Sequence, residues 1–402
     1  MKYLLIIGDG MADYPLPELE NRTPLEVAPT PNLDRLASES GRLGMVRTIP
    51  RGTMAASDTA FLSIMGLDPR QNHPGRGPLE AINLGLRLTD EEVAFRLNLV
   101  TQDEKKMVDS SAGHISDGEA GRLMAVLQEH FQGRRMRFVP GKSYRNLLIM
   151  ERPPFDWRKL VTTPPHDILG RPLTPYLPKG PGGEFLIGMM EEAARIFAEH
   201  PINRTRIDLG ENPANLVWPW GQGGPAQLPA FQPRYGLTGF TVSAVDIVKG
   251  IGLAVGLEAV SVPGATGYLD TNYAGKVEAA IEGLKRHDFG VLHVEAPDEA
   301  SHSGQWRLKV KAITDFDQRV VGPAVSALRT EFPESRVMVM ADHITSLRTR
   351  THTPDPIPFL ISGTGVVGRG AATFSEKTAG AGRRYLREGW RLMEFFLRPE
   401  IT

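Results

Sequence analysis

The chain has 402 residues, of which 41% are hydrophobic and 23% are charged, and its formal net charge is −1. This balance is typical of a globular protein, and it gives no indication of a nucleic-acid partner or of an anionic membrane surface. The chain contains no cysteine, which excludes disulfides, thiolate metal sites and a cysteine nucleophile.

The chain begins with MKYLLIIGDG, in which the apolar run 3–7 predicts a buried strand. This run is too short for the apolar segment of a secretory signal, which needs roughly 7–15 residues. No other segment approaches the roughly 18 uncharged apolar residues of a membrane span. We therefore expect a cytoplasmic protein with no membrane partner.

Short runs rich in Val, Ile and Leu alternate with amphipathic helical patterns, which is typical of an α/β fold with a mostly parallel sheet. The predicted helices cover residues 32–38, 58–65, 186–199, 244–255, 273–286 and 307–330. The predicted strands cover residues 3–7, 290–295, 337–340 and 358–361. The length alone suggests about two or three domains.

The middle of the chain differs from its ends, because it is rich in Pro and Gly, as in PPHDILGRPLTPYLPKGPGG. The first strand most resembles the strands of the last third. We therefore predict a discontinuous metal-binding core formed by residues 1–80 and 238–402, with residues 81–237 inserted as a substrate-binding domain.

Carboxylate and imidazole side chains follow three of the predicted strands. These side chains are Asp9 after the first strand, Asp298 and His302 after the second, Asp342 and His343 after the third, and His352 in the next loop. Ligand sites gather outside the carboxyl ends of parallel strands, so we expect one shared site. Oxygen and nitrogen donors of this kind suit one or two divalent ions. A single Asp-His pair is more often a cap or a salt bridge, so the prediction depends on their coincidence.

A candidate nucleophile lies in RGTMAASDTAFLSIMGLDP. Ser57 precedes an apolar-periodic segment that ends at Gly66, so we predict that it is a helix N-cap. The same place lies beside free backbone N–H groups, which suit a phosphate. A metal ion on the hydroxyl would lower its pKa and activate it.

Motifs along nearly the whole chain resemble a known family. TPNLDRLA resembles the helix signature of the alkaline phosphatase superfamily, and SDTAFLSIMGLDP, GRGPLEA, GATGYLDTNYAGKVEAA, APDEASH and HTPDPIPFLI resemble archaeal-type, cofactor-independent phosphoglycerate mutases. PGKSYRNLLIM, TPPHDILG and HVEAPDEA are most similar to a branch proposed as homoserine kinases. The resemblance implies an alkaline-phosphatase-like α/β core with an inserted second α/β domain.

The resemblance also implies two cation sites. One ion would be held by Asp298, His302 and His352, and the other by Asp9, Ser57, Asp342 and His343. Manganese fits the family best, with magnesium or zinc as alternatives, and neither nucleotide nor bisphosphoglycerate is expected. The implied reaction interconverts 3-phosphoglycerate and 2-phosphoglycerate through a phosphoserine on Ser57.

Basic side chains are expected to bind the carboxylate and phosphate of this small substrate, arginine through bidentate contacts. The candidates are Arg96, Arg145, His166, Arg171 and Lys249. Each of them could also be an ordinary surface cation.

Two other reactions remain open from the sequence. A homoserine kinase-like phosphotransferase would need a nucleotide site, but PGKSY lacks the first glycine of a P-loop, because Met136 occupies that position. A phosphomonoesterase could use the same metals and serine, with water as the acceptor. The oligomeric state cannot be inferred from these patterns.

Overall fold

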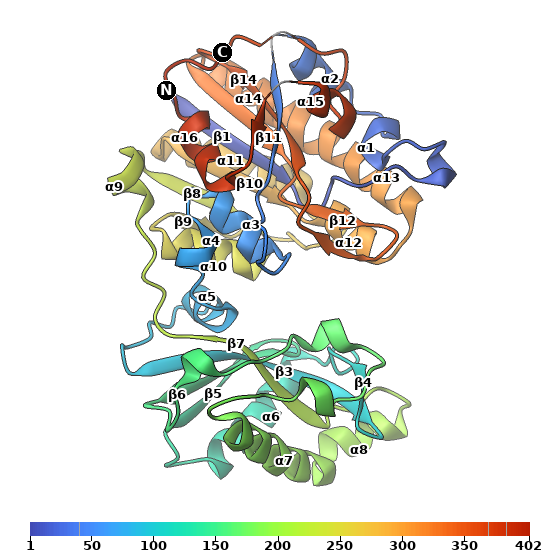
Figure 1. The fold of residues 1–402 in the computed structure, drawn as a ribbon, viewed down its shortest axis with the longest axis vertical. Coiled ribbons are helices and arrows are strands. Elements are labelled where there is room, and N and C mark those ends of the chain that lie inside the picture. Colours follow the sequence, from blue (N-terminus) through green and yellow to red (C-terminus); the bar gives the residue numbers. More distant parts are fainter. Residues whose placement is uncertain (40, 369, 383) are drawn as a thin grey trace. The chain divides into compact units, whose positions relative to one another are not determined.

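The computed structural model describes residues 1–39, 41–368, 370–382 and 384–402 (Figure 1). The chain forms two compact units. Unit 1 consists of Met1–His73 and Leu228–Thr402, and unit 2 consists of Pro74–Gln227, so unit 2 interrupts unit 1 in the sequence. The predicted roles of the domains, in metal binding and in substrate binding, stay predictions.

Unit 1 is built on an eight-stranded sheet with the order β15-β2-β14-β11-β1-β10-β8-β9. Its five parallel neighbours are β11 (Ser335–Met340), β1 (Lys2–Gly8), β10 (Phe289–Val294), β8 (Gly239–Val242) and β9 (Glu258–Val260). β14 (Ile357–Gly363) runs antiparallel to β11 and to β2 (Arg42–Val46), and β15 (Tyr385–Leu386) is parallel to β2. The predicted α/β fold with a mostly parallel sheet is confirmed.

The central strands of unit 1 are apolar along nearly their whole length. β10 and β11 are buried at every residue, and β1 is buried from Tyr3 onward. Continuous burial of this kind arises when helices cover both faces of a parallel sheet. The helices of unit 1 include α2 (Pro31–Ser38), α3 (Ser57–Ile64), α10 (Asp246–Ala254), α11 (Tyr273–Arg286) and α12 (Ala296–His302).

The prediction of one continuous helix over residues 307–330 is wrong in one respect, because a π-helical turn interrupts it. The structure has α13 (Trp306–Phe316), a π-helical turn at Asp317–Val321 and then α14 (Gly322–Glu331). Asp317 at the start of this turn accepts hydrogen bonds from the backbone N–H groups of Asn32 and Leu33. The wider turn thus lets a carboxylate satisfy the orphan donors at the start of α2.

Unit 2 contains a five-stranded antiparallel sheet. Its strands are β3 (Glu92–Asp103), β4 (Lys106–Asp109), β5 (Met136–Lys142), β6 (Arg145–Glu151) and β7 (Leu216–Gly223). Its helices include α5 (Arg76–Asn83), α6 (Asp117–His130), α7 (Gly183–Glu199) and α8 (Pro201–Asp208). Apolar side chains of β3, α6 and α7 form the main core of the unit, and Ala81 of α5 packs in a second, smaller cluster.

Among the described residues, no helix combines the length and the apolar character that crossing a membrane requires.

Candidate active site

Three neighbouring parallel strands of unit 1 end at the same edge of the sheet and deliver acidic residues there. Asp9 follows β1 directly, and Asp342 lies two residues after β11. β10 leads into α12, which carries Asp298 and His302 one helical turn apart, on the same face. The strand order therefore brings together side chains that are up to 333 positions apart in the sequence.

The first ligand group consists of Asp298, His302 and His352. The Nε2 atoms of His302 and His352 lie 3.2 and 3.4 Å from the two carboxylate oxygens of Asp298, and 3.1 Å from each other. His302 Nδ1 donates a hydrogen bond to the backbone carbonyl of Arg350 at 2.9 Å. That bond leaves Nε2 as the nitrogen that faces Asp298.

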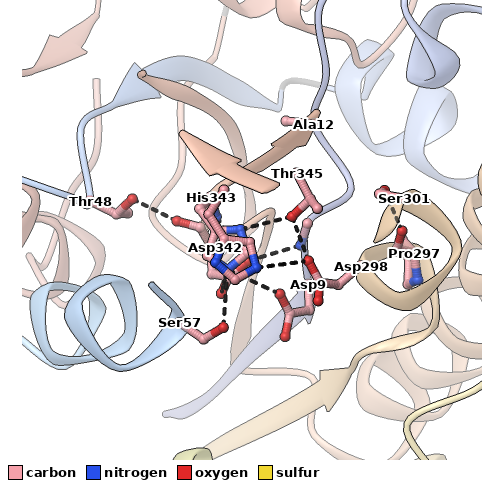
Figure 2. Close-up of polar contacts among 12 residues, drawn as sticks. Asp9, Ala12, Thr48, Ser57, Pro297, Asp298, Ser301, Asp342, His343 and Thr345 are labelled. Atoms are coloured by element: carbon pink, nitrogen blue, oxygen red, sulfur yellow. Dashed lines mark hydrogen bonds and ion pairs between the residues drawn. The ribbon is translucent and has the colours of Figure 1, made fainter. Parts of the chain in front are cut away.

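The second ligand group consists of Asp9, Ser57, Asp342 and His343 (Figure 2). His343 Nε2 lies 3.4 Å from Asp9 Oδ1, 3.2 Å from Asp342 Oδ2 and 3.1 Å from Ser57 Oγ. Asp9, Asp342 and His343 are at most 2% exposed. The structure thus brings all seven predicted ligand residues into two groups, while their role as metal ligands stays a prediction.

The prediction that Ser57 is a helix N-cap is wrong. α3 begins at Ser57, Ala56 occupies the N-cap position, and no side chain caps the helix. The Ser57 hydroxyl is hydrogen-bonded to His343 Nε2 instead. Its place at the start of a helix remains, but its side chain belongs to the second ligand group.

The carboxylates of the site repel one another. Burial raises the pKa of Asp9 well above its usual value, and repulsion by Asp342 and Asp298 raises this pKa further. Asp9 Oδ1 is buried without a hydrogen-bond partner. A divalent cation would relieve both the repulsion and the missing contact, so the residues present fit a metal ion.

In the first ligand group, the histidines compensate the charge of the carboxylate better. Burial raises the pKa of Asp298, but hydrogen bonds from His302 and His352 outweigh burial and hold this pKa well below its usual value. Burial lowers the pKa of His302, and the Asp298 carboxylate more than compensates, so that the pKa of His302 rises to about 9. A cation at this position would have to displace the proton of His302.

Sequence reasoning missed two buried residues at the site, His293 and Thr345. His293 Nε2 lies 3.1 Å from Asp9 Oδ2, while its Nδ1 is hydrogen-bonded to Ser243 Oγ at 3.1 Å. Burial lowers the pKa of His293 to about 4, so its imidazole is neutral near pH 7. For His293, the only signal in the sequence is that a polar residue lies near the end of an apolar strand, in VLHVEAP.

The substrate-binding candidates lie in both units. In unit 1, Lys249 lies on α10, with its Nζ 3.1 Å from Asp246 Oδ1. In unit 2, Arg171 donates a hydrogen bond to Tyr176 Oη, and Arg145 donates one to Tyr144 Oη, both at 3.1 Å. These contacts leave the role of the three cations in substrate binding a prediction.

Arg96 lies in a cluster of cations around Trp220 in unit 2. Arg96 is 4% exposed and pairs with Glu80, and Arg76 Nε lies 3.2 Å from the same Glu80 oxygen. The guanidinium groups of Arg76 and Arg96 lie 5.9 and 5.6 Å from the ring centroid of Trp220, and the His166 ring packs edge-on at 5.5 Å. We call Arg76, Glu80, Arg96, His166 and Trp220 the arginine cluster.

Arg96 of the arginine cluster is a buried cation that other cations surround. Burial lowers the pKa of Arg96 to about 10, attraction by Glu80 counteracts this, and repulsion by Arg76 and Arg145 adds to it. Arg96 Nε is buried without a hydrogen-bond partner. An anionic ligand would supply the missing acceptor for this nitrogen.

Comparison with known proteins gives consistent results. The family model described as 2,3-bisphosphoglycerate-independent phosphoglycerate mutase matches residues 38–203. A relative of that name from Methanothrix thermoacetophila is 46% identical over 397 residues, which cover 99% of this chain and 100% of the relative. A solved structure from Pyrococcus horikoshii has 30% identity and a TM-score of 0.82, and covers 98% of this chain and 96% of its own. The cofactor-independent phosphoglycerate mutase from Thermoplasma acidophilum has 28% identity and a TM-score of 0.64, with 99% of each chain covered.

Proposed function

The chain belongs to the 2,3-bisphosphoglycerate-independent phosphoglycerate mutase family, and on this premise we propose that it interconverts 3-phosphoglycerate and 2-phosphoglycerate through a phosphoserine on Ser57. The observation that carries the proposal is the 3.1 Å contact between Ser57 Oγ and His343 Nε2, beside two buried aspartates. A hydroxyl that faces ligand-type side chains at the start of a helix is suited to accept a phosphoryl group.

Two divalent cations complete the proposal. Asp298, His302 and His352 would hold one of them. Asp9, Asp342, His343 and the Ser57 oxygen would hold the other. When bound, the cations supply the positive charge that lowers the pKa of a hydroxyl and stabilises a transferring phosphoryl group. We expect manganese on the strength of the family resemblance, with magnesium or zinc as alternatives, since oxygen and nitrogen donors accept all three ions.

The transfer itself needs no external phosphate donor. In the first step the Ser57 hydroxyl gives up its proton and its Oγ forms a bond to phosphorus, while the ester bond to one glycerate oxygen breaks and that oxygen takes up a proton. In the second step the other glycerate hydroxyl loses its proton and bonds to the same phosphorus, while the bond to Ser57 Oγ breaks and Oγ takes up a proton. Atoms and charges balance over the two steps, so neither nucleotide nor bisphosphoglycerate is consumed.

The substrate carries a carboxylate and a phosphate, which cationic side chains would bind. Arg96 is the strongest candidate, because its buried guanidinium has an unpartnered Nε. His166 belongs to the same cluster, and Lys249, Arg145 and Arg171 are further candidates. Bidentate pairing between arginine and an acid group would provide both charge and direction.

An assay with 3-phosphoglycerate and manganese, without bisphosphoglycerate or nucleotide, tests the proposal. We expect 2-phosphoglycerate to form with little release of free phosphate. Faster release of phosphate than of 2-phosphoglycerate would indicate a phosphomonoesterase instead, and turnover only with homoserine and ATP would indicate a kinase. Ser57→Ala should remove turnover while metal binding stays measurable.

A further inference from the structure

Thr345 connects the two ligand groups through a single hydroxyl (Figure 2). It lies in the short strand β12 (Ile344–Ser346) and is 0% exposed. Its Oγ1 donates a hydrogen bond to Asp298 Oδ1 at 2.5 Å, and it lies 3.1 Å from His343 Nδ1. Asp298 belongs to the first ligand group, and His343 belongs to the second.

The chemistry of these contacts fixes the position of one proton. A hydroxyl has one hydrogen to donate, and an ionised carboxylate can only accept, so the hydrogen of Thr345 points to Asp298. The Thr345 oxygen must then accept a hydrogen bond from Nδ1–H of His343. A neutral imidazole protonated at Nδ1 has its lone pair on Nε2, the nitrogen that faces Asp9, Asp342 and Ser57.

The surrounding chain holds the Thr345 hydroxyl in place. The backbone carbonyl of Thr345 accepts a hydrogen bond from Lys309 Nζ at 2.7 Å. The buried ammonium group of Lys309 also lies 2.9 Å from Asp13 Oδ2. β12 pairs with β13 (Thr351–Thr353), which places Thr345 opposite His352. A Cβ atom at Gly10 would lie 2.5 Å from the hydroxyl oxygen, so glycine is required for the loop after Asp9 to pass this close.

We propose that Thr345 is a positioning residue that couples the two cation sites. It keeps the Nε2 lone pair of His343 available, and it orients the Asp298 carboxylate at the same time. Cation binding in one group is therefore coupled to binding in the other, because both groups share one ordered hydroxyl. The inference rests on the proposed two-cation function. Thr345 would act as a hydrogen-bond partner of metal ligands, and the loss of such a partner typically costs 10- to 100-fold in metal affinity.

Manganese titration of the full chain tests the proposal, with binding followed through the paramagnetic resonance signal of free Mn²⁺. Thr345→Val keeps the shape of the side chain but removes the hydroxyl. We expect its Mn²⁺ affinity to fall by about 10- to 100-fold and the coupling between the two binding steps to disappear. Thr345→Ser keeps the hydroxyl and should restore both.

Thr241→Val is the matched control. Thr241 is also a buried threonine of unit 1, but its hydroxyl is bonded to the backbone carbonyl of Glu258. This variant should bind Mn²⁺ like the wild type. Equal affinity and coupling in Thr345→Val and the wild type would overturn the inference, whereas a wild type that binds no Mn²⁺ would overturn the proposed function itself.

A second measurement tests the tautomer of His343 directly. Nitrogen NMR shifts of metal-free, wild-type protein report the tautomer of His343, with His343→Gln used to assign the signal. We expect a proton on Nδ1 and none on Nε2. A proton on Nε2 would overturn the inference.

Discussion

In unit 1, the buried charge around Ser57 comes mainly from carboxylates, whereas in unit 2 the buried charge around Trp220 comes mainly from arginine. Asp9, Asp298 and Asp342 are each at most 5% exposed, and Arg96 is 4% exposed. Each region keeps a polar atom buried without a partner, Asp9 Oδ1 in the first and Arg96 Nε in the second.

The contrast teaches that each region buries a charged side chain, Asp9 or Arg96, that the described contacts do not fully satisfy. Uncompensated buried charge is costly, and it persists where a ligand supplies the opposite charge. The carboxylate region thus fits cations, and the arginine cluster fits an anion.

The largest effect is expected from Asp9→Asn, which removes charge from the carboxylate region. Turnover should fall by about 1000-fold or more, since the proposed function makes Asp9 a metal ligand beside the Ser57 nucleophile. The pKa of Asp9 is raised, so its charged form destabilises the metal-free fold near pH 7. We therefore expect metal-free Asp9→Asn to unfold a few degrees higher than metal-free wild type, as measured by calorimetry. A lower unfolding temperature would contradict the repulsion.

Arg96→Met tests the arginine cluster of unit 2. We expect kcat/KM to fall by about 100-fold, because one charge-assisted contact to the substrate is worth about 1.5–3 kcal/mol. Affinity for Mn²⁺ should stay unchanged. Arg137→Met is the matched control, because Arg137 pairs with Glu92 on the exposed surface of the same unit. Equal kinetics of the two variants would exclude Arg96 from substrate binding.

Lys276 sharpens the comparison, because it is a buried cation beside the carboxylates. Its Nζ donates a hydrogen bond to the backbone carbonyl of His293 at 3.2 Å, and burial lowers its pKa to about 8. At pH values between about 8 and the ordinary lysine pKa, the unfolded chain binds more protons than the folded chain. The free energy of unfolding therefore rises with pH in this range. From pH 8 to pH 9.5 the rise should be about 2 kcal/mol.

Urea unfolding of metal-free wild type and Lys276→Met at the two pH values measures this contribution. The difference in free energy of unfolding between wild type and Lys276→Met should change by about 2 kcal/mol between the two pH values. The two proteins share all their other titrating groups, whose contributions therefore cancel. A difference that is independent of pH would show that Lys276 keeps its ordinary pKa.

The smallest effect is expected from Lys249→Ala. Lys249 is already paired with Asp246, so its net attraction for a substrate anion is reduced. We expect kcat/KM to fall by about tenfold, with the change mainly in KM. Lys285→Ala, which removes a lysine paired with Glu282 on α11, is the control and should leave both constants unchanged.

Sequence patterns predicted the parallel sheet and the residues at its edge well. Runs such as LLII and VMVM are apolar without alternation, which is typical of strands covered on both faces. Asp9, Asp298 and Asp342 directly follow such strands, or begin the next helix, so their convergence follows from parallel pairing. The π-helical turn at Asp317–Val321 could not be predicted, because it depends on the contact of Asp317 with α2.

For β1, β10 and β11, the sequence by itself determined that the strand is buried and which side chains follow it, because both features follow from local patterns of apolar and polar residues. Only the tertiary structure decided that Ser57 faces His343 rather than capping its helix, and that Thr345 joins the two ligand groups. Arg96 and Glu80 likewise meet only through the packing of α5 on β3. Such pairs depend on the direction of side chains across packed elements, which spacing along the chain does not encode.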